Sequence, residues 1–450
     1  MAKVYYDLNP SQEVVKLQCK YTLFKRVINI VFSSSVDYEL DFDLMQKAFN
    51  IVVQRNDCLR IRFKTIKGKL KQYFEKEVIF DNIERLSFDT KEKQDQFIKS
   101  ISKHAIKYKK GEVVIPYFIK TYDNKYMVLL KICHLIIDIH GLNFLFNDLF
   151  DVYDSLLNNK EFPPMPYPFE EIVKHDLSKK ENKQRYNENR EFFKNYLANH
   201  DEPYYAGVHG PNEPIWKKQL QKGKRAMKMF FVQNDTVPYE HKIGGEIINK
   251  AIEFSKKYQI TLTNVFFYAC SLTCSILNNN VTSMLPLQLC NCRTSLNDRN
   301  CAGTKVQSIG CFTEVDYEKS FVENLNEFTL TQLKLYRRIN FSDQDFEMLV
   351  HNTYKSSMLE SYYSITFSFV PYNRRKDVTY NLYSNGKGAL PCYLVLLYDV
   401  NSNEIRMGYD VQKKITSEQD VLNFHNRYLK MLNDVLDNPE LMLKESIKND

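Results

Sequence analysis

The chain has 450 residues, enough for two domains, and its 44% hydrophobic and 26% charged residues exclude a mainly disordered protein. The formal net charge is +7 and is spread along the chain, which argues against a nucleic-acid-binding protein but suits an acidic protein partner. Only 13 residues are glycine, and neither a Gly-x-Gly-x-x-Gly motif nor a Walker-type loop occurs, so enzymes that hold phosphates on glycine loops are excluded.

The N-terminal part alternates strands and helices, which makes the expected fold class mixed α/β. Hydrophobic patterning predicts, in chain order, a strand over 24–32, a helix over 41–54, a strand over 59–63, a basic helix over 91–107, a hairpin of strands over 113–121 and 126–134, and a helix over 142–157. Four prolines between 163 and 168 then interrupt regular structure, and a polar helix over 178–200 follows. We place the domain boundary there, with domains over 1–177 and 178–450.

The C-terminal part repeats this kind of alternation. Its predicted elements are a strand over 225–232, helices over 245–258 and 261–277, a strand over 283–289, a helix over 321–338, strands over 365–370, 393–398 and 405–409, and a helix over 418–436. The two halves share a coarse order of elements, which predicts a pair of related domains with a cleft between them.

The ten cysteines fall at irregular intervals, with no Cys-x-x-Cys pair and no signal peptide before them, which favours free thiols in a cytoplasmic protein. Cys290 and Cys292 supply only two of the four ligands usual for structural zinc, so we expect no metal. The longest strongly apolar stretch, around 390–397, is far shorter than the roughly 20 residues of a membrane span, so we expect no membrane partner.

His134 and Asp138 are the strongest candidates for chemistry. The histidine ends a predicted strand, and the acid stands four residues later, before a predicted helix. A neutral imidazole can accept a proton at neutral pH, so His134 is the expected general base. Asp138 can either orient that base directly or pair with an arginine that holds the loop. Neither a Gly-x-Ser-x-Gly nor a His-Glu-x-x-His motif occurs, which favours a base that activates a nucleophile of the substrate.

The segment CHLIIDIHGLNFLFNDLFDVYDSL resembles the His-His-x-x-x-Asp-Gly region of nonribosomal peptide synthetase condensation domains, within the chloramphenicol acetyltransferase-like superfamily. Its second histidine falls on His134 and its aspartate on Asp138. Other stretches resemble further family motifs in the same order: QRNDCLRIRF (54–63), REFFKNYL (190–197), SIGCFTEV (308–315) and the closing segment from Met407. The resemblance therefore covers nearly the whole chain.

The resemblance implies two acetyltransferase-like subdomains in a V-shaped pseudo-dimer with a central tunnel. It also implies that His134 assists attack on a thioester by an amine or hydroxyl, and that Asp138 is salt-bridged to an arginine. We expect Arg60 to be that arginine, because it matches the second arginine of its motif.

The sequence departs from the family pattern at several positions. Cys133 replaces the first histidine, and Ile139 replaces the glycine that permits an unusual backbone conformation, while Gly141 follows two residues later and can shift the turn. Glu314 stands where the family commonly has asparagine, and its carboxylate could hold a cationic amine. His140 is an alternative base. We group Glu314, His140, Cys133 and Gly141 as candidate substrate-binding residues.

We expect a free-standing condensation-type acyltransferase that joins a carrier-protein or coenzyme A thioester to an amine, forming an amide in natural-product biosynthesis. The expected partners are an acyl or peptidyl carrier protein and a small amine or alcohol. The phosphopantetheine-linked donor is expected as substrate, with no permanently bound cofactor. Two alternatives stay open: an ester-forming O-acyltransferase of the same superfamily, and a non-catalytic module that docks carrier proteins.

Overall fold

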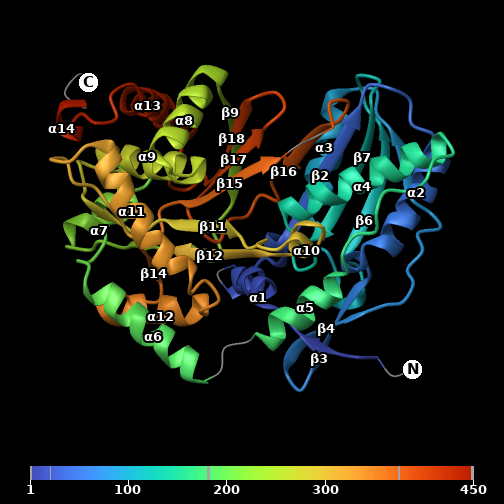
Figure 1. The fold of residues 1–450 in the computed structure, drawn as a ribbon, viewed down its shortest axis with the longest axis horizontal. Coiled ribbons are helices and arrows are strands. Elements are labelled where there is room, and N and C mark those ends of the chain that lie inside the picture. Colours follow the sequence, from blue (N-terminus) through green and yellow to red (C-terminus); the bar gives the residue numbers. More distant parts are fainter. Residues whose placement is uncertain (1–2, 21, 180–182, 373–374, 447–450) are drawn as a thin grey trace. The chain divides into compact units, whose positions relative to one another are not determined.

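The computed structural model describes residues 3–20, 22–179, 183–372 and 375–446. The chain forms two compact units (Figure 1). Unit 1 comprises Met1–Lys180, Asn291–Gln307 and Tyr372–Lys387, and unit 2 comprises Glu181–Cys290, Ser308–Pro371 and Gly388–Asp450. The first break lies close to the predicted boundary after residue 177. The prediction did not foresee that two later segments, 291–307 and 372–387, leave the C-terminal part and belong to unit 1.

Unit 1 is built on a five-stranded sheet with the order β16-β2-β7-β6-β5, antiparallel except for the parallel pair β5 and β6. Its strands are β2 (Asn29–Val36), β5 (Glu84–Ser87), β6 (Val114–Lys120), β7 (Tyr126–Cys133) and β16 (Thr379–Tyr383). Strands β6 and β7 form the predicted hairpin, with Asn124 in the left-handed region (φ 60°), which asparagine tolerates in turns.

The helices of unit 1 are α1 (Pro10–Leu17), α2 (Phe42–Arg55), α3 (Lys91–Lys103), α4 (Ile139–Leu157), α5 (Phe169–Ser178) and the short α10 (Leu296–Arg299). Helices α3 and α4 pack against opposite faces of the five-stranded sheet. Because side chains alternate along a strand, Val31 of β2 packs into the cluster that includes Ile98 of α3, while the next ring, Phe32, contacts Phe146 of α4. A smaller antiparallel sheet contains β1 (Tyr6–Asp7), β4 (Lys69–Phe74) and β3 (Ile61–Ile66).

Unit 2 is built on a sheet with the order β12-β11-β15-β17-β18-β9. The strands are β9 (Thr236–Ile243), β11 (Leu287–Asn291), β12 (Val306–Gly310), β15 (Thr366–Tyr372), β17 (Cys392–Asp399) and β18 (Glu404–Gln412), and two short pairs join β10 (Ser283–Met284) with β13 (Thr313–Glu314) and β8 (Met227–Lys228) with β14 (Glu360–Ser361). The helices are α6 (Lys183–Ala198), α7 (Pro214–Gln221), α8 (Gly245–Tyr258), α9 (Leu262–Leu277), α11 (Phe321–Tyr336), α12 (Asp343–Tyr354), α13 (Glu418–Asp437) and α14 (Leu443–Ser446).

The two units repeat one arrangement, which confirms the prediction of two related mixed α/β halves. In unit 1 the strands lie in the order β2-β7-β6, with α2 after β2 and α4 after β7. In unit 2 the order is β9-β18-β17, with α8 after β9 and α13 after β18. All four strand pairs are antiparallel. Each unit therefore contains a strand end, a turn and a helix start of the same kind.

Some predicted elements are wrong in position. The predicted strand over 225–232 is reduced to Met227–Lys228, and the long strand is β9, eight residues further on. Pro238 and the alternation of polar residues hide β9 in the sequence, and both are tolerated because β9 lies at the edge of its sheet. The predicted helix over 178–200 corresponds to α6, and its residues 180–182 lie outside the described residues.

Candidate functional site

His134 stands in the turn between β7 and α4. Its backbone N–H donates to the Ile28 carbonyl oxygen at 2.9 Å, and the Ile136 N–H donates to the Cys133 carbonyl at 3.0 Å. The half-buried imidazole places Nδ1 2.9 Å from the Ile137 carbonyl oxygen. Because a carbonyl oxygen only accepts hydrogen bonds, Nδ1 carries the proton and Nε2 keeps its lone pair.

The surroundings keep this imidazole neutral near pH 7. Burial lowers the pKa of His134 below its ordinary value of about 6.5, and the Asp138 carboxylate and the Ile137 carbonyl offset this only in part. A neutral imidazole with an available Nε2 is a competent general base at physiological pH. The structure therefore gives His134 the protonation state that proton abstraction requires.

Asp138 is the N-cap of α4 and the centre of a buried hydrogen-bond network. Its Oδ1 accepts from the Gly141 N–H at 2.8 Å. Its Oδ2 accepts from Arg293 Nη1 at 2.9 Å and from the Lys305 N–H at 2.7 Å. The Asp138 and Arg293 side chains are each only 5% exposed. Burial raises the pKa of Asp138, but Arg293 and these hydrogen bonds hold it below its ordinary value.

Asp138 is therefore salt-bridged to an arginine, as expected, but the choice of Arg60 is wrong. Arg60 donates instead to the backbone carbonyls of Glu75 and Gln54, each at 3.2 Å, so its guanidinium is used locally. The partner, Arg293, lies 155 residues after Asp138 in the chain. Asp138 does not receive the Nδ1 proton of His134, which goes to Ile137, so of its two possible roles the structure has the salt bridge.

The segment Asn291–Gln307, which we call the support segment, was missed as part of the site. Its Thr304 hydroxyl donates to the His134 carbonyl oxygen at 2.9 Å, and Arg293 Nη2 donates to the Gly303 carbonyl at 2.5 Å. Lys305 Nζ pairs with Asp176 of α5 at 2.9 Å. The support segment thus holds the backbone of the base, the carboxylate of Asp138 and helix α5 together within unit 1.

Gly141 permits the closest contact between α4 and the support segment. A Cβ atom at this position would lie 1.9 Å from the Ala302 carbonyl oxygen and 2.8 Å from Ile137 Cγ1. Ile139 adopts the ordinary helical conformation as the first residue of α4, so the turn forms without the family glycine there. The buried position of Gly141 gives it a packing role and does not support the expected role in substrate binding.

We expect Gly141→Ala to lower the free energy of unfolding by about 1–3 kcal/mol or more, because backbone atoms must move to admit the methyl group. Gly245→Ala is the matched control, since Gly245 is also in the first turn of a helix and its Cβ would meet only Asn403, at ordinary distances of 3.5 Å to the carbonyl oxygen and 3.6 Å to Nδ2. The control should be neutral or stabilising by up to about 1 kcal/mol. Urea unfolding of both variants tests this, and an equal effect would contradict it.

The other candidate residues divide between the units. Cys133 is 0% exposed at the end of β7, and burial raises the pKa of its thiol to about 12, so it offers a substrate no surface. His140 is half-buried in the first turn of α4, and burial lowers its pKa to about 4. Glu314 belongs to unit 2, where its exposed carboxylate on β13 lies 4.0 Å from His200 Nε2, and its role in holding an amine stays a prediction.

The repeat in unit 2 shows that the turn itself needs no histidine. Lys413 stands after β18 as His134 stands after β7, and its N–H donates to the Asp235 carbonyl at 3.0 Å. The Ile415 N–H then donates to the Gln412 carbonyl, and Ser417 caps α13 where Asp138 caps α4. Because the same turn forms around a lysine, the geometry of the turn does not require a histidine at position 134.

Neither a metal-binding cluster nor a single helix able to cross a membrane is found within residues 3–20, 22–179, 183–372 and 375–446, the part of the chain that the structure describes. Within it, no group of three or more His, Cys, Asp or Glu side chains is placed to hold a metal ion. No single helix in these ranges is long and apolar enough to cross a membrane. Helices α8 and α9 meet that criterion only as a pair, and they are bent by 112° relative to each other.

The fold and the site define a class of protein with two mixed α/β units, one of which carries a strand-end histidine and, in the turn that follows, a buried Asp–Arg pair. A family model described as "Condensation domain" matches residues 3–448, so the chain belongs to the condensation-domain family. This match confirms the resemblance drawn from the sequence. The family consists of acyl-transferring domains of nonribosomal peptide synthesis that use thioester donors.

The relatives and solved structures agree with this assignment. Gramicidin S synthase 2 from Brevibacillus brevis is 26% identical over 44% of this chain, and bacitracin synthase 3 from Bacillus licheniformis is 21% identical over 76%. The chain spans only 4% and 5% of the length of these two relatives.

Two solved condensation domains have the same fold. The first condensation domain of the calcium-dependent antibiotic synthetase, solved with a substrate analogue, has a TM-score of 0.79 at 14% identity, with 98% of each chain covered. The condensation domain of the monacolin K polyketide synthase also has a TM-score of 0.79, at 11% identity, with 98% of this chain and all of that chain covered. At these identities the likeness shows the fold alone.

Proposed function

We propose that this domain catalyses amide formation between an acyl thioester and an amine, with His134 as the general base. The observation that carries the proposal is the state of that imidazole: Nδ1 donates to Ile137, the pKa is lowered by burial, and Nε2 keeps its lone pair. The support segment holds the backbone of His134 and the N-cap contact holds the start of α4, so the turn that carries the imidazole is fixed on both sides. This lowers the entropic cost of orienting the imidazole during the reaction.

In the proposed reaction the amine nitrogen attacks the thioester carbonyl carbon while His134 Nε2 accepts one of its protons. The carbon–sulfur bond then breaks, the thiolate leaves, and it recovers a proton from the imidazolium. One carbon–nitrogen bond forms, one carbon–sulfur bond breaks, and the free thiol and the amide are the products. The imidazole returns to its neutral state, so no further reactant is needed.

The proposed donor is an acyl group on the phosphopantetheine arm of a carrier protein or on coenzyme A, used as substrate with no permanent cofactor. Carrier domains are typically acidic, and the net charge of +7 favours their approach through electrostatic steering. The proposal concerns the domain and holds whether the donor is delivered by a separate protein or by another part of a longer one. We further propose that the Glu314 carboxylate interacts with an acceptor that carries a positive charge.

The proposal is tested by incubating the protein with carrier proteins loaded with different acyl groups and with a panel of amines and alcohols, followed by intact-mass analysis. Amide products that depend on the protein support the proposal. Ester products alone would replace it with O-acylation, because the same imidazole can accept a hydroxyl proton. Carrier binding without turnover of any donor would contradict catalysis and favour a docking module.

A further inference from the structure

A basic surface in unit 2 is formed by α7, by the strand pair of β8 and β14, and by the turn between α12 and β14. The strands pair so that Lys228 lies opposite Glu360, and the Met229 N–H donates to the Leu359 carbonyl oxygen at 2.8 Å. Helix α7 packs against this pair, because Trp216 shares a small apolar cluster with β8. We call the following exposed side chains the basic face: Lys217, Lys218, Lys222, Lys224, Lys228, Met358 and Leu359.

The basic face has an excess of positive charge. Segments 213–228 and 355–361, which carry it, contain seven basic and two acidic residues, a net charge of +5. Both acids are used within the fold: Glu213 accepts from the Trp216 N–H at 2.6 Å, and Glu360 pairs with Lys224 at 3.5 Å. Four lysines of the face have no ion pair with any residue that the structure describes, namely Lys217, Lys218, Lys222 and Lys228. A negatively charged partner would therefore meet charges that the fold has not neutralised.

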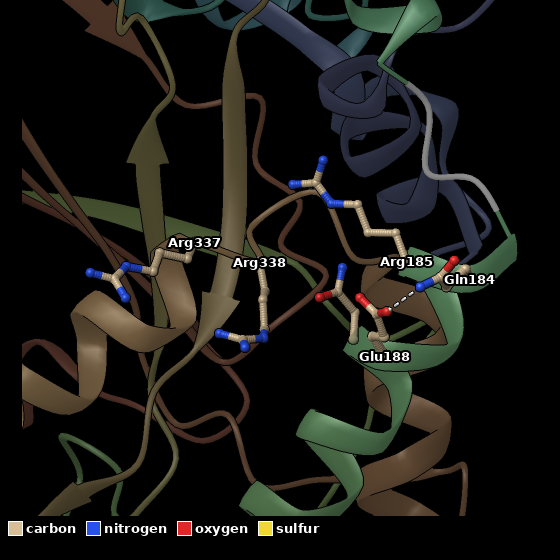
Figure 2. A pocket seen from close by; sticks show the side chains of 6 residues that line it. Gln184, Arg185, Glu188, Arg337 and Arg338 are labelled. Atoms are coloured by element: carbon tan, nitrogen blue, oxygen red, sulfur yellow. Dashed lines mark hydrogen bonds between the residues drawn. The ribbon is translucent and has the colours of Figure 1, made fainter.

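Unit 2 also has an arginine-rich hollow of about 390 Å³, between α6 and the residues that follow α11. Its guanidinium groups do not converge on one point, because Arg337 points away from Arg185 and Arg338 (Figure 2). The lysines of the basic face need no common point if their partner is an extended anionic surface, which meets all of them at once.

Two large apolar side chains project from the basic face. Met358 is 52% exposed and Leu359 is 58% exposed. Their turn is fixed by its own hydrogen bonds, because the Glu360 N–H donates to the Ser357 carbonyl oxygen at 2.9 Å and the Leu359 N–H donates to Ser357 Oγ at 3.2 Å. Moving such side chains from water into an apolar medium is favourable in proportion to the area that leaves water.

We propose that the basic face binds the surface of a membrane that contains anionic lipids. The lysines attract the headgroups, each raising the affinity about fivefold, and Met358 and Leu359 enter the boundary of the acyl chains. The composition favours lipid over protein, since protein interfaces are enriched in aromatic residues and arginine and depleted in lysine. The exposed residues of segments 213–228 and 355–361 include six lysines and no aromatic residue. Contact at a surface needs no helix that crosses the membrane, and it is independent of His134 and of the proposed acyl transfer.

Cosedimentation of the whole chain with lipid vesicles tests the proposal. The protein should bind vesicles made of equal parts of phosphatidylcholine and phosphatidylglycerol, should not bind vesicles of phosphatidylcholine alone, and should lose affinity as the salt concentration rises. Lys222→Gln combined with Lys228→Gln should weaken binding by at least about tenfold, because two contributions of about fivefold are lost. Met358→Ser combined with Leu359→Ser should also weaken binding by at least about tenfold, although it removes no charge. Thermal unfolding checks that both double variants fold.

The matched control is Lys256→Gln combined with Lys334→Gln, which removes two exposed lysines of unit 2 from α8 and α11, outside the basic face. It should change the affinity by less than about twofold, because it leaves the basic face intact. Absence of wild-type binding to the mixed vesicles at low salt would overturn the proposal, and so would an equal loss in the control or unchanged binding of the Met358 and Leu359 variant. Binding of poly-glutamate through Lys222 and Lys228 without binding to vesicles would also overturn it, and would identify an acidic protein as the partner.

Discussion

Replacing His134 by alanine should lower the rate of acyl transfer by about 10²- to 10⁴-fold, the usual contribution of a positioned general base. The variant should still fold, because the equivalent turn in unit 2 forms around Lys413 and the lost Nδ1 hydrogen bond to Ile137 contributes only about 1 kcal/mol. Single-turnover measurement of amide formation, together with thermal unfolding, separates the loss of chemistry from a loss of structure.

The pH profile adds a readout that a purely structural role would not affect. Burial holds the pKa of His134 below its ordinary value of about 6.5, and the amine acceptor titrates in wild type and variant alike, so the ratio of kcat/KM in wild type to that in His134→Ala should stay level as the pH falls toward 6.5 and decline only below it, when Nε2 becomes protonated. A ratio that falls with an inflection above the ordinary imidazole pKa would contradict the assignment of His134 as base.

His140, in the first turn of α4, provides the comparison because it is the alternative base. Burial lowers its pKa to about 4. We expect His140→Gln to retain most of the activity and the wild-type pH profile. A large loss in His140→Gln with little loss in His134→Ala would exchange the two assignments.

The parts of the site that are local in sequence could be predicted. The apolar spacing of α4, the hairpin of β6 and β7, and the placement of His134 and Asp138 between them all depend on neighbours within about 20 residues. Helices α8 and α9 were predicted almost to the residue for the same reason. The spacing of apolar residues is enough to predict a strand followed by a turn and an amphipathic helix. His134 lies in this turn, so its position could be predicted as well.

The partner of Asp138 could not be predicted, because the salt bridge is a tertiary contact. Arg60 stands in a local pattern that matched a family motif, yet the backbone carbonyls of Gln54 and Glu75 hold its guanidinium. Arg293 lies in a polar segment without strong periodicity, and only the return of the chain to unit 1 brings it to Asp138. The ion-pair geometry depends on the path of the support segment, which patterning does not reveal.

Asp138→Asn should lower the free energy of unfolding by about 3–5 kcal/mol, since it leaves the Arg293 guanidinium buried without its counter-charge. The amide would also present N–H groups or a weaker acceptor to the Lys305 N–H, which now donates to Oδ2 at 2.7 Å. Urea unfolding monitored by fluorescence measures this loss. The matched control is Asp37→Asn, which breaks the exposed pair with Lys125 and should cost less than about 1 kcal/mol.

The pH dependence of this loss has a definite sign. The pKa of Asp138 is held below its ordinary value of about 3.8, so the native ion pair contributes stability that is present above about pH 4 and lost as the pH falls through the lowered pKa. The difference in unfolding free energy between wild type and Asp138→Asn should therefore be constant between pH 5 and pH 8, roughly, and shrink on acidification below about pH 4. A difference that grows on acidification would contradict the assigned pKa direction.

A double-mutant cycle with Arg293→Met then isolates the pair itself. Each single substitution leaves one charged group buried without its counter-charge, whereas the double variant removes both charges. The double variant should therefore cost less than the sum of the two single losses, by more than about 1 kcal/mol. Additive losses would mean that Asp138 and Arg293 act independently, and that Asp138 stabilises the turn only through its hydrogen bonds to the Gly141 and Lys305 N–H groups. These hydrogen bonds and the Thr304 contact all hold the turn that carries His134. If the losses are not additive, we therefore expect each single variant to lose amide formation in proportion to its fraction of unfolded protein.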